Sequence, residues 1–327
     1  MAAWDRVRKA AASRGRRPAA WLALLLCAAA PGDGVPARAE LPLFAEHAGR
    51  FPSLVEIAVG GGRPIPISFD TGSTGLYVMA RDVGPDLERT GTPIHQGFVD
   101  GTRFEGYVGL TPVAFPRAGI ATAGRIAVGV ITRVFCSEER PNCPGSDTKP
   151  GVMGVDLAAE GQVFSPLLQL PGALRSGFVV EARDGVRPRV ILGAMPDIAR
   201  GFRFMPLDPL PAAHAGIASW DSGSVRGCYG VNGAAASCQP VIFDTGQTNS
   251  VFDGDAVPNM RLGPHGYLLP GQRFTLRVDG ALALSVPIDP SIYVLAARTR
   301  RSNIGQLVFR STAVAFDPVL GRIGFRQ

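Results

Sequence analysis

Two copies of one short phrase carry the residues of this chain that could do chemistry. Residues 67–74 read ISFDTGST and residues 241–248 read VIFDTGQT, so each copy is an apolar run that leads an aspartate, Asp70 or Asp244, into a tight Thr-Gly turn. If the two turns face one another, repulsion between the carboxylates leaves one of them protonated, and the pair can activate a water molecule. A lone Asp-Thr-Gly is most simply a turn, because Asp and Gly are common turn residues, but the repeat favours a paired function.

The chain around these phrases is a series of short apolar runs separated by Gly, Pro and Asp. The runs are rich in β-branched and aromatic residues, which is typical of strands, and the few short helical candidates cover residues 165–170 and 253–257. We therefore predict a mostly β protein and exclude an alternating parallel α/β fold. Residues 205–213 (MPLDPLPAA) have the Pro-rich and Ala-rich composition of a linker between two halves.

The first 39 residues have the composition of an export signal. Basic residues at positions 6–17 precede an apolar run over residues 19–30, and Ala37-Arg38-Ala39 supplies a small-x-small cleavage site. The apolar run is too short to span a bilayer. We expect residues 1–39 to be removed as a signal peptide, so that the rest of the chain is exported, either to the periplasm or beyond the cell.

Removal of this leader changes the charge of the chain. The whole chain has a net charge of +6, whereas residues 40–327 hold 26 basic and 25 acidic side chains. The basicity therefore belongs to the leader, and we expect no nucleic-acid partner and no membrane association after its removal.

Four cysteines remain after residue 39, in two local pairs. Cys136 and Cys143 bracket a polar loop, and Cys228 and Cys238 bracket a stretch rich in Gly, Ala and Asn. In an exported chain this spacing favours two disulfides. A zinc site is the alternative, but the cysteine spacings do not fit one and the four histidines are scattered, so we expect no metal.

Taken together, these residues resemble the pepsin-like aspartic proteases (family A1), in a bacterial, exported form, from about residue 52 onward. Three further segments follow the family's order: GVMGV at residues 151–155, VILG at 190–193 with GFRFMPL at 201–207, and AFDPVLGRIGF at 315–325. The resemblance implies an all-β, bilobal fold with two similar β-barrel-like lobes and the active-site cleft between them. The lobes are expected over residues 40–205 and 206–327.

The resemblance also implies roles for the residues of the two turns. Asp70 and Asp244 are the implied catalytic pair, which activates water and protonates the developing oxyanion. The threonines are expected to bond across the lobes, and the glycines to permit close approach of the backbone. Ser73 can donate to Asp70 or simply stabilise its own turn. The supporting residues are Thr71, Gly72, Ser73, Thr245, Gly246 and Gln247.

A hairpin lid, or flap, is a further feature implied by the resemblance. Residues 96–106 (QGFVDGTRFEG) match it, with Phe98, Asp100 and Gly101 as the substrate-binding candidates. Phe98 falls nearest to the family's flap tyrosine, so the flap hydroxyl is expected to be absent. An ordinary exposed hairpin is the alternative interpretation.

Three positions depart from the family pattern. Gln247 replaces the small hydroxyl residue that usually follows the second Asp-Thr-Gly, Asn303 stands where an apolar residue normally precedes Ile-Gly, and Tyr77 stands where the family often has tryptophan. We predict an aspartic endopeptidase that acts on polypeptides as a monomer, without a cofactor. The alternative, motivated by Phe98, Gln247 and Asn303, is a catalytically weak, inhibitor-like module that binds peptides or a protein partner.

Overall fold

The computed structural model describes residues 35–144, 150–234, 237–254, 257 and 260–327. Residues 35–327 group as one compact unit, in which nearly all regular structure of the described residues is strand, so the prediction of an all-β protein is confirmed. No helix among the described residues is long and apolar enough to cross a membrane. The described helices are all short: α1 (Met195–Ile198) and the 3-10 turns η1 (Ala80–Asp82), η2 (Pro116–Ala118), η3 (Pro166–Gln169), η4 (Gly172–Ser176), η5 (Pro264–Gly266) and η6 (Gly305–Arg310).

Most of the predicted signal peptide, residues 1–34, lies outside the described residues. The last two residues of the predicted signal peptide, Arg38 and Ala39, are the first two residues of strand β1 (Arg38–Pro42). This strand pairs antiparallel with β12 (Arg189–Gly193). The signal peptide and its cleavage site stay predictions.

The first large sheet is built from residues 54–155. Its strands are β2 (Leu54–Val59), β3 (Ile65–Asp70), β4 (Thr74–Met79), β5 (Glu88–Gly97), β6 (Thr102–Thr111), β7 (Val113–Phe115), β8 (Ile120–Ala121), β9 (Ile126–Cys136) and β10 (Gly151–Val155), in the order β5-β6-β9-β4-β10-β3-β2-β7-β8. Strand β2 buries every second side chain, as expected for a strand with one face on a core. The sheet delivers Asp70 at the end of β3.

The second large sheet has seven strands and is built from residues 226–303. Its strands are β16 (Arg226–Val231), β17 (Ser237–Ile242), β18 (Ser250–Asp253), β19 (Arg273–Val278), β20 (Leu282–Pro287), β21 (Val294–Ala297) and β22 (Ser302–Asn303), in the order β20-β19-β16-β17-β22-β18-β21. Strand β17 leads into Asp244, as β3 leads into Asp70.

The two large sheets share one internal arrangement around their aspartate turns. Strand β10 lies between β3 and β4, parallel to the first and antiparallel to the second, and places Gly154 opposite Asp70. Strand β22 lies in the same way between β17 and β18, and places Asn303 opposite Ile242. The repeat of the sequence is therefore a repeat of strand topology.

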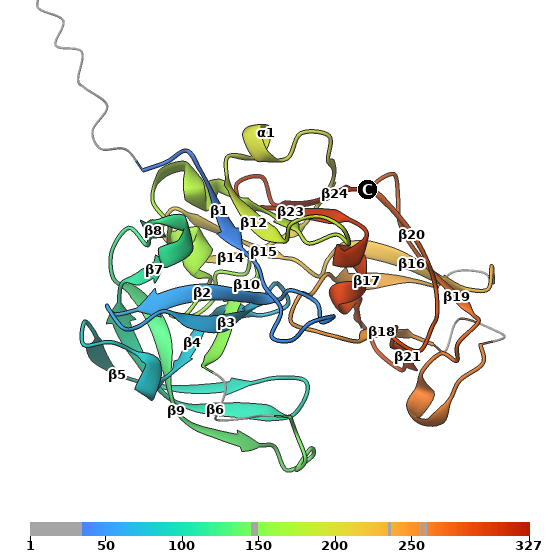
Figure 1. The fold of residues 1–327 in the computed structure, drawn as a ribbon, viewed down its shortest axis with the longest axis horizontal. Helices are drawn as coiled ribbons and strands as arrows, with labels where there is room; N and C mark the ends of the chain where they lie inside the picture. The colour runs from blue at the N-terminus through green and yellow to red at the C-terminus, as the bar shows by residue number, and fades with distance from the viewer. Residues whose placement is uncertain (1–34, 145–149, 235–236, 255–256, 258–259) are drawn as a thin grey trace, which may run out of the picture. The chain divides into compact units, whose positions relative to one another are not determined.

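A third sheet joins segments from both halves of the chain. It contains β1 and β12, with β11 (Phe178–Glu181), β13 (Arg203–Pro206), β23 (Ala313–Asp317) and β24 (Arg322–Arg326), in the order β1-β12-β11-β23-β24-β13. Figure 1 shows β1, in blue, beside β12, with the red strands β23 and β24 of the C-terminal end close by. The expected linker over residues 205–213 forms the end of β13 and most of β14 (Asp208–His214), which pairs with β15 (Ile217–Asp221). The lobe boundary at residues 205/206 stays a prediction.

This third sheet supports both aspartates through aromatic contacts. Phe69, directly before Asp70, meets Phe178 edge-on at 6.1 Å, and Phe178 stacks on Phe316 at 4.7 Å. Phe243, directly before Asp244, meets Phe325 edge-on at 4.9 Å. All five rings are at most 1% exposed, so the residues before both aspartates are fixed by one buried layer.

We predict that Phe178→Ala lowers the free energy of unfolding by about 3–5 kcal/mol, because it leaves a cavity between two buried rings. Urea unfolding followed by circular dichroism measures the change. Phe135→Ala, at a half-buried position in β9, is the control and has a smaller effect. Equal effects of the two substitutions would contradict the supporting role of Phe178.

Candidate active site

Reciprocal hydrogen bonds between two buried threonines hold the aspartate turns together. The Thr71 amide donates to Thr245 Oγ1 at 3.1 Å, and the Thr245 amide donates to Thr71 Oγ1 at 3.0 Å. Each hydroxyl donates in turn to the carbonyl before the other aspartate: Thr71 to Phe243 at 2.8 Å and Thr245 to Phe69 at 2.6 Å. The cross-bonding that the resemblance implies for these threonines is therefore present, and it fixes the two turns in one register.

The glycines of the two turns bring each carboxyl against the opposite backbone. A Cβ atom placed on Gly72 would lie 2.2 Å from Asp244 Cγ, and one on Gly246 would lie 2.6 Å from Asp70 Cγ. No side chain fits at either position, so the Asp-Thr-Gly pattern is required by close approach here. The carboxyls themselves are buried, with Asp70 8% and Asp244 7% exposed, although both line a cavity.

The two carboxyls have different hydrogen-bond partners. Asp70 accepts from the Gly72 amide at 2.9 Å and from Ser73 Oγ at 2.5 Å, so Ser73 contacts the carboxylate as expected. Asp244 Oδ1 accepts from the amides of Gly246 at 2.7 Å and Gln247 at 3.2 Å, and Oδ2 accepts from Asn303 Nδ2 at 2.6 Å. The Asn303 contact was missed from the sequence, where the residue stood out only as a polar side chain at an apolar position.

The environment of Asp244 favours its protonated form. Burial raises the pKa of this carboxyl well above its ordinary value, and repulsion from the Asp70 carboxylate and a hydrogen bond between the two carboxyls raise it further. The bonds from Asn303 and Gly246 oppose this rise in pKa. In a closely coupled pair the proton belongs to both groups, and the raised pKa of Asp244 favours this carboxyl as the protonated one.

The cavity around the pair has a volume of about 560 Å³ and is covered by the hairpin of β5 and β6. Phe98 and Asp100 of the predicted flap line it, and the Phe98 ring packs edge-on against Phe104 at 5.0 Å. Gly101 is not among the lining residues. It turns the hairpin with φ of +97°, and its carbonyl accepts from the Ser137 amide at 2.8 Å.

A polar contact links the base of the flap to the body of the sheet. The Tyr77 hydroxyl donates to Gln96 Oε1 at 3.0 Å, and Gln96 lines the cavity two residues before Phe98. This contact therefore joins the hairpin to β4 through Gln96. The sequence showed that Tyr77 departs from the family pattern, but its hydrogen bond with Gln96 depends on where the hairpin lies in the fold.

Both predicted cysteine pairs are joined as disulfides, Cys136–Cys143 and Cys228–Cys238. The first closes the loop that packs on the flap tip, where Gly101 lies against Arg140. Among the described residues no group of three or more His, Cys, Asp or Glu side chains has the arrangement of a metal site.

Asp156 is a third carboxyl at the cavity, directly after β10. Its Oδ1 accepts from the Ala158 amide at 2.9 Å and from Ser222 Oγ at 2.8 Å. Burial raises its pKa to about 6 against these two bonds, and repulsion from Asp221 and Asp70 adds to the rise. Asp156 was not among the predicted site residues, because a single aspartate after a strand belongs to no recognisable motif.

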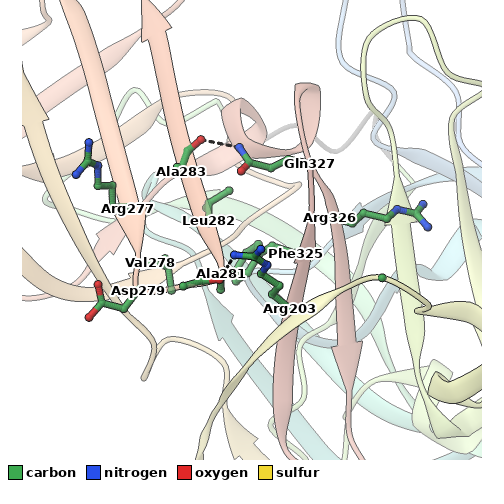
Figure 2. A pocket seen from close by; sticks show the side chains of 12 residues that line it. Arg203, Arg277, Val278, Asp279, Ala281, Leu282, Ala283, Phe325, Arg326 and Gln327 are labelled. Atoms are coloured by element: carbon green, nitrogen blue, oxygen red, sulfur yellow. Dashed lines mark hydrogen bonds between the residues drawn. The ribbon is translucent and has the colours of Figure 1, made fainter.

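A second hollow, of about 540 Å³, lies between the β19–β20 hairpin and β24. Figure 2 shows Gln327 at the Ala283 carbonyl, to which it donates at 2.5 Å. Arg203 donates to the Gly280 carbonyl at 3.0 Å. Asp279 is the one carboxylate side chain among its described lining residues, so this hollow cannot perform the chemistry of a carboxyl pair.

Comparisons with known proteins agree with this arrangement. A sequence model of the PE-PGRS C-terminal aspartyl peptidase-like domain matches residues 40–196, a stretch that contains Asp70 and the flap but not Asp244. The crystal structure of an aspartic proteinase from Irpex lacteus is similar with a TM-score of 0.58 and 12% sequence identity, over 89% of this chain and 97% of that chain. No curated protein matches the chain. The chain therefore has the bilobal, all-β fold of an aspartic protease.

We predict that Thr245→Val lowers the free energy of unfolding by about 1–3 kcal/mol, because it leaves the buried Thr71 amide without its acceptor. Thr248→Val, three residues later at an exposed position, is the control. Urea unfolding compares the two, and equal stabilities would contradict the importance of the reciprocal bonds.

We predict that Asp156→Asn raises the free energy of unfolding by about 1–3 kcal/mol at pH 7.5 and leaves it nearly unchanged at pH 3.5. The folded-state pKa of about 6 exceeds the ordinary value of 3.8, so the protonated carboxyl favours folding at low pH, and this contribution is lost as the pH rises through 6. Urea titrations at the two pH values measure the difference. Asp279→Asn, at an exposed turn, serves as control, and a pH-independent effect of Asp156→Asn would refute the assignment.

Proposed function

We propose that this protein is an aspartic endopeptidase, which hydrolyses peptide bonds with a water molecule activated between Asp70 and Asp244. The observation that carries the proposal is that two buried carboxyls, each packed against the glycine of the opposite turn, line one cavity. Such a pair holds a base and an acid side by side, as water attack on an amide requires.

In the proposed reaction Asp70 is the base and Asp244 the acid. Asp70 takes a proton from water while the water oxygen bonds to the peptide carbonyl carbon, and Asp244 gives its proton to the carbonyl oxygen. When the intermediate breaks down, the carbon–nitrogen bond is cleaved, Asp70 passes its proton to the leaving amine, and Asp244 recovers its own. The donors on Asp70 from Ser73 and Gly72 fix the orientation of its carboxyl, which suits the role of base.

The cavity supports an extended peptide with apolar side chains as the substrate. Apolar groups from the flap and from the sheet beneath it form much of the lining: Met79, Phe98, Phe104, Ile131, Val134 and Val152. Their burial against a substrate favours binding and excludes water from the carboxyl pair. The two disulfides support export of the protein to an oxidising compartment, the periplasm or the cell exterior.

The alternative is a catalytically weak module that binds peptides or a partner protein. It rested on Phe98, Gln247 and Asn303, which replace residues usual in the pepsin-like family. One of these departures has a compensating contact in the structure, because Asn303 donates to Asp244 Oδ2 where Gln247 offers no hydroxyl. The geometry therefore supports the enzyme over the binding module.

We predict that Asp70→Asn and Asp244→Asn each reduce cleavage of a denatured protein by at least about 10²–10⁴-fold, because each removes one partner of the acid–base pair. Cleavage is measured between about pH 3 and 7, with and without a statine-type transition-state mimic, which should inhibit the wild type. Asp279→Asn, at an exposed turn, is the control. Activity that survives either dyad substitution would refute the mechanism, and tight peptide binding by an inactive wild type would favour the alternative.

A further inference from the structure

Asn303 donates a side-chain hydrogen bond to Asp244 Oδ2, an atom to which residue 247 supplies no side-chain donor. In the first turn the residue after Asp-Thr-Gly is Ser73, and its hydroxyl donates to Asp70 Oδ2 at 2.5 Å. In the second turn that position is Gln247, whose backbone amide donates to Asp244 Oδ1 at 3.2 Å. The other oxygen of Asp244, Oδ2, accepts from Asn303 Nδ2 at 2.6 Å. Each carboxyl thus has a side-chain donor on Oδ2, but the two donors come from different strands.

The Asn303 amide is held in the orientation that this bond requires. Its Oδ1 accepts from the Gly305 amide at 2.9 Å, so the Nδ2 end must face Asp244. Strand β22 is fixed on both sides, by pairing of Asn303 with Ile242 of β17 and with Val251 of β18. At the start of β22, Arg301 forms two bonds with Asp221, of 3.0 and 2.7 Å. The donor is therefore preorganised rather than dependent on a flexible side chain.

We propose that Asn303 is a positioning residue, which supplies to Asp244 the side-chain donor that Ser73 supplies to Asp70, and which makes a hydroxyl at residue 247 unnecessary. This role rests on the proposed endopeptidase function. An amide nitrogen only donates, whereas a hydroxyl both donates and accepts. The Asn303 bond therefore commits Asp244 Oδ2 as the acceptor of a neutral donor.

The charged group that faces Asp244 among the described residues is Asp70, and the other neighbours contribute neutral donors: Gly246, Gln247 and Asn303. Loss of the Asn303 donor would remove a contact that stabilises the ionised form of Asp244. The loss should therefore shift the ionisation of the pair to higher pH. A role limited to packing would not move this ionisation.

The first test is a pH profile of kcat/KM for four variants: Asn303→Leu, Gln247→Ser, the double variant and the control Asn249→Leu. Asn249 donates to the Tyr267 hydroxyl at 2.9 Å and to no carboxyl. We expect Asn303→Leu to lower kcat/KM at its optimum by about tenfold and to move the alkaline limb up by about one pH unit. In the double variant the new hydroxyl should return the limb to within about 0.3 unit of the wild type. An unmoved limb in Asn303→Leu, or a shift that the double variant does not reverse, would overturn the proposal.

The second test uses the wild-type protein and depends on neither activity nor the folding of a variant. A titration by nuclear magnetic resonance follows the side-chain amide protons of Asn303 and Asn249 together with the aspartate carboxyl carbons. We expect the Asn303 protons to shift downfield with the same inflection as the Asp244 carboxyl, and the Asn249 protons to stay unmoved. Asn303 protons that do not respond would overturn the proposal. If they respond in a protein that cleaves no peptide, the endopeptidase function fails while the positioning role stands.

Discussion

The reciprocal bonds between Thr71 and Thr245 are the constraint on which the site depends. They are buried, they join the turns of two sheets formed from opposite halves of the chain, and they set the distance between those turns. With the turns fixed in this register, a glycine hydrogen is all that fits between each backbone and the opposite carboxyl. The pairing of the carboxyls and their mutual repulsion follow from that close approach, and together with burial they raise the pKa of Asp244.

The third sheet gives this constraint its rigidity. It takes strands from the first, middle and last parts of the described chain, and its rings Phe178 and Phe325 pack against the phenylalanines that precede the two aspartates. Close-packed aromatic groups leave little room for either turn to move. The two halves of the site are thus supported by one layer, although their own sheets have different numbers of strands.

The sequence predicts the part of the site that local pattern determines. Asp70, Asp244 and their Thr-Gly turns were visible because the phrase occurs twice, and the strand-rich composition predicted the β fold. Asn303 stood out only as a departure from the family pattern, Gln96 only as part of the flap stretch, and Asp156 not at all, because their contacts are with partners 59, 19 and 66 residues away in the chain. Such contacts depend on strand register, which no local motif encodes. Gly101 was assigned to substrate binding by its place in the flap, whereas the structure turns it away from the cavity toward the disulfide loop.

The two carboxyls occupy equivalent positions in their turns but have different hydrogen-bond partners, and we infer that both nevertheless act on one bound group. A crystal structure of the protein with a statine-type peptide tests this claim most directly. We expect the statine hydroxyl to lie within hydrogen-bonding distance of both Asp70 and Asp244, with the peptide extended beneath Phe98. A peptide bound elsewhere, or a hydroxyl in contact with neither carboxyl, would contradict it.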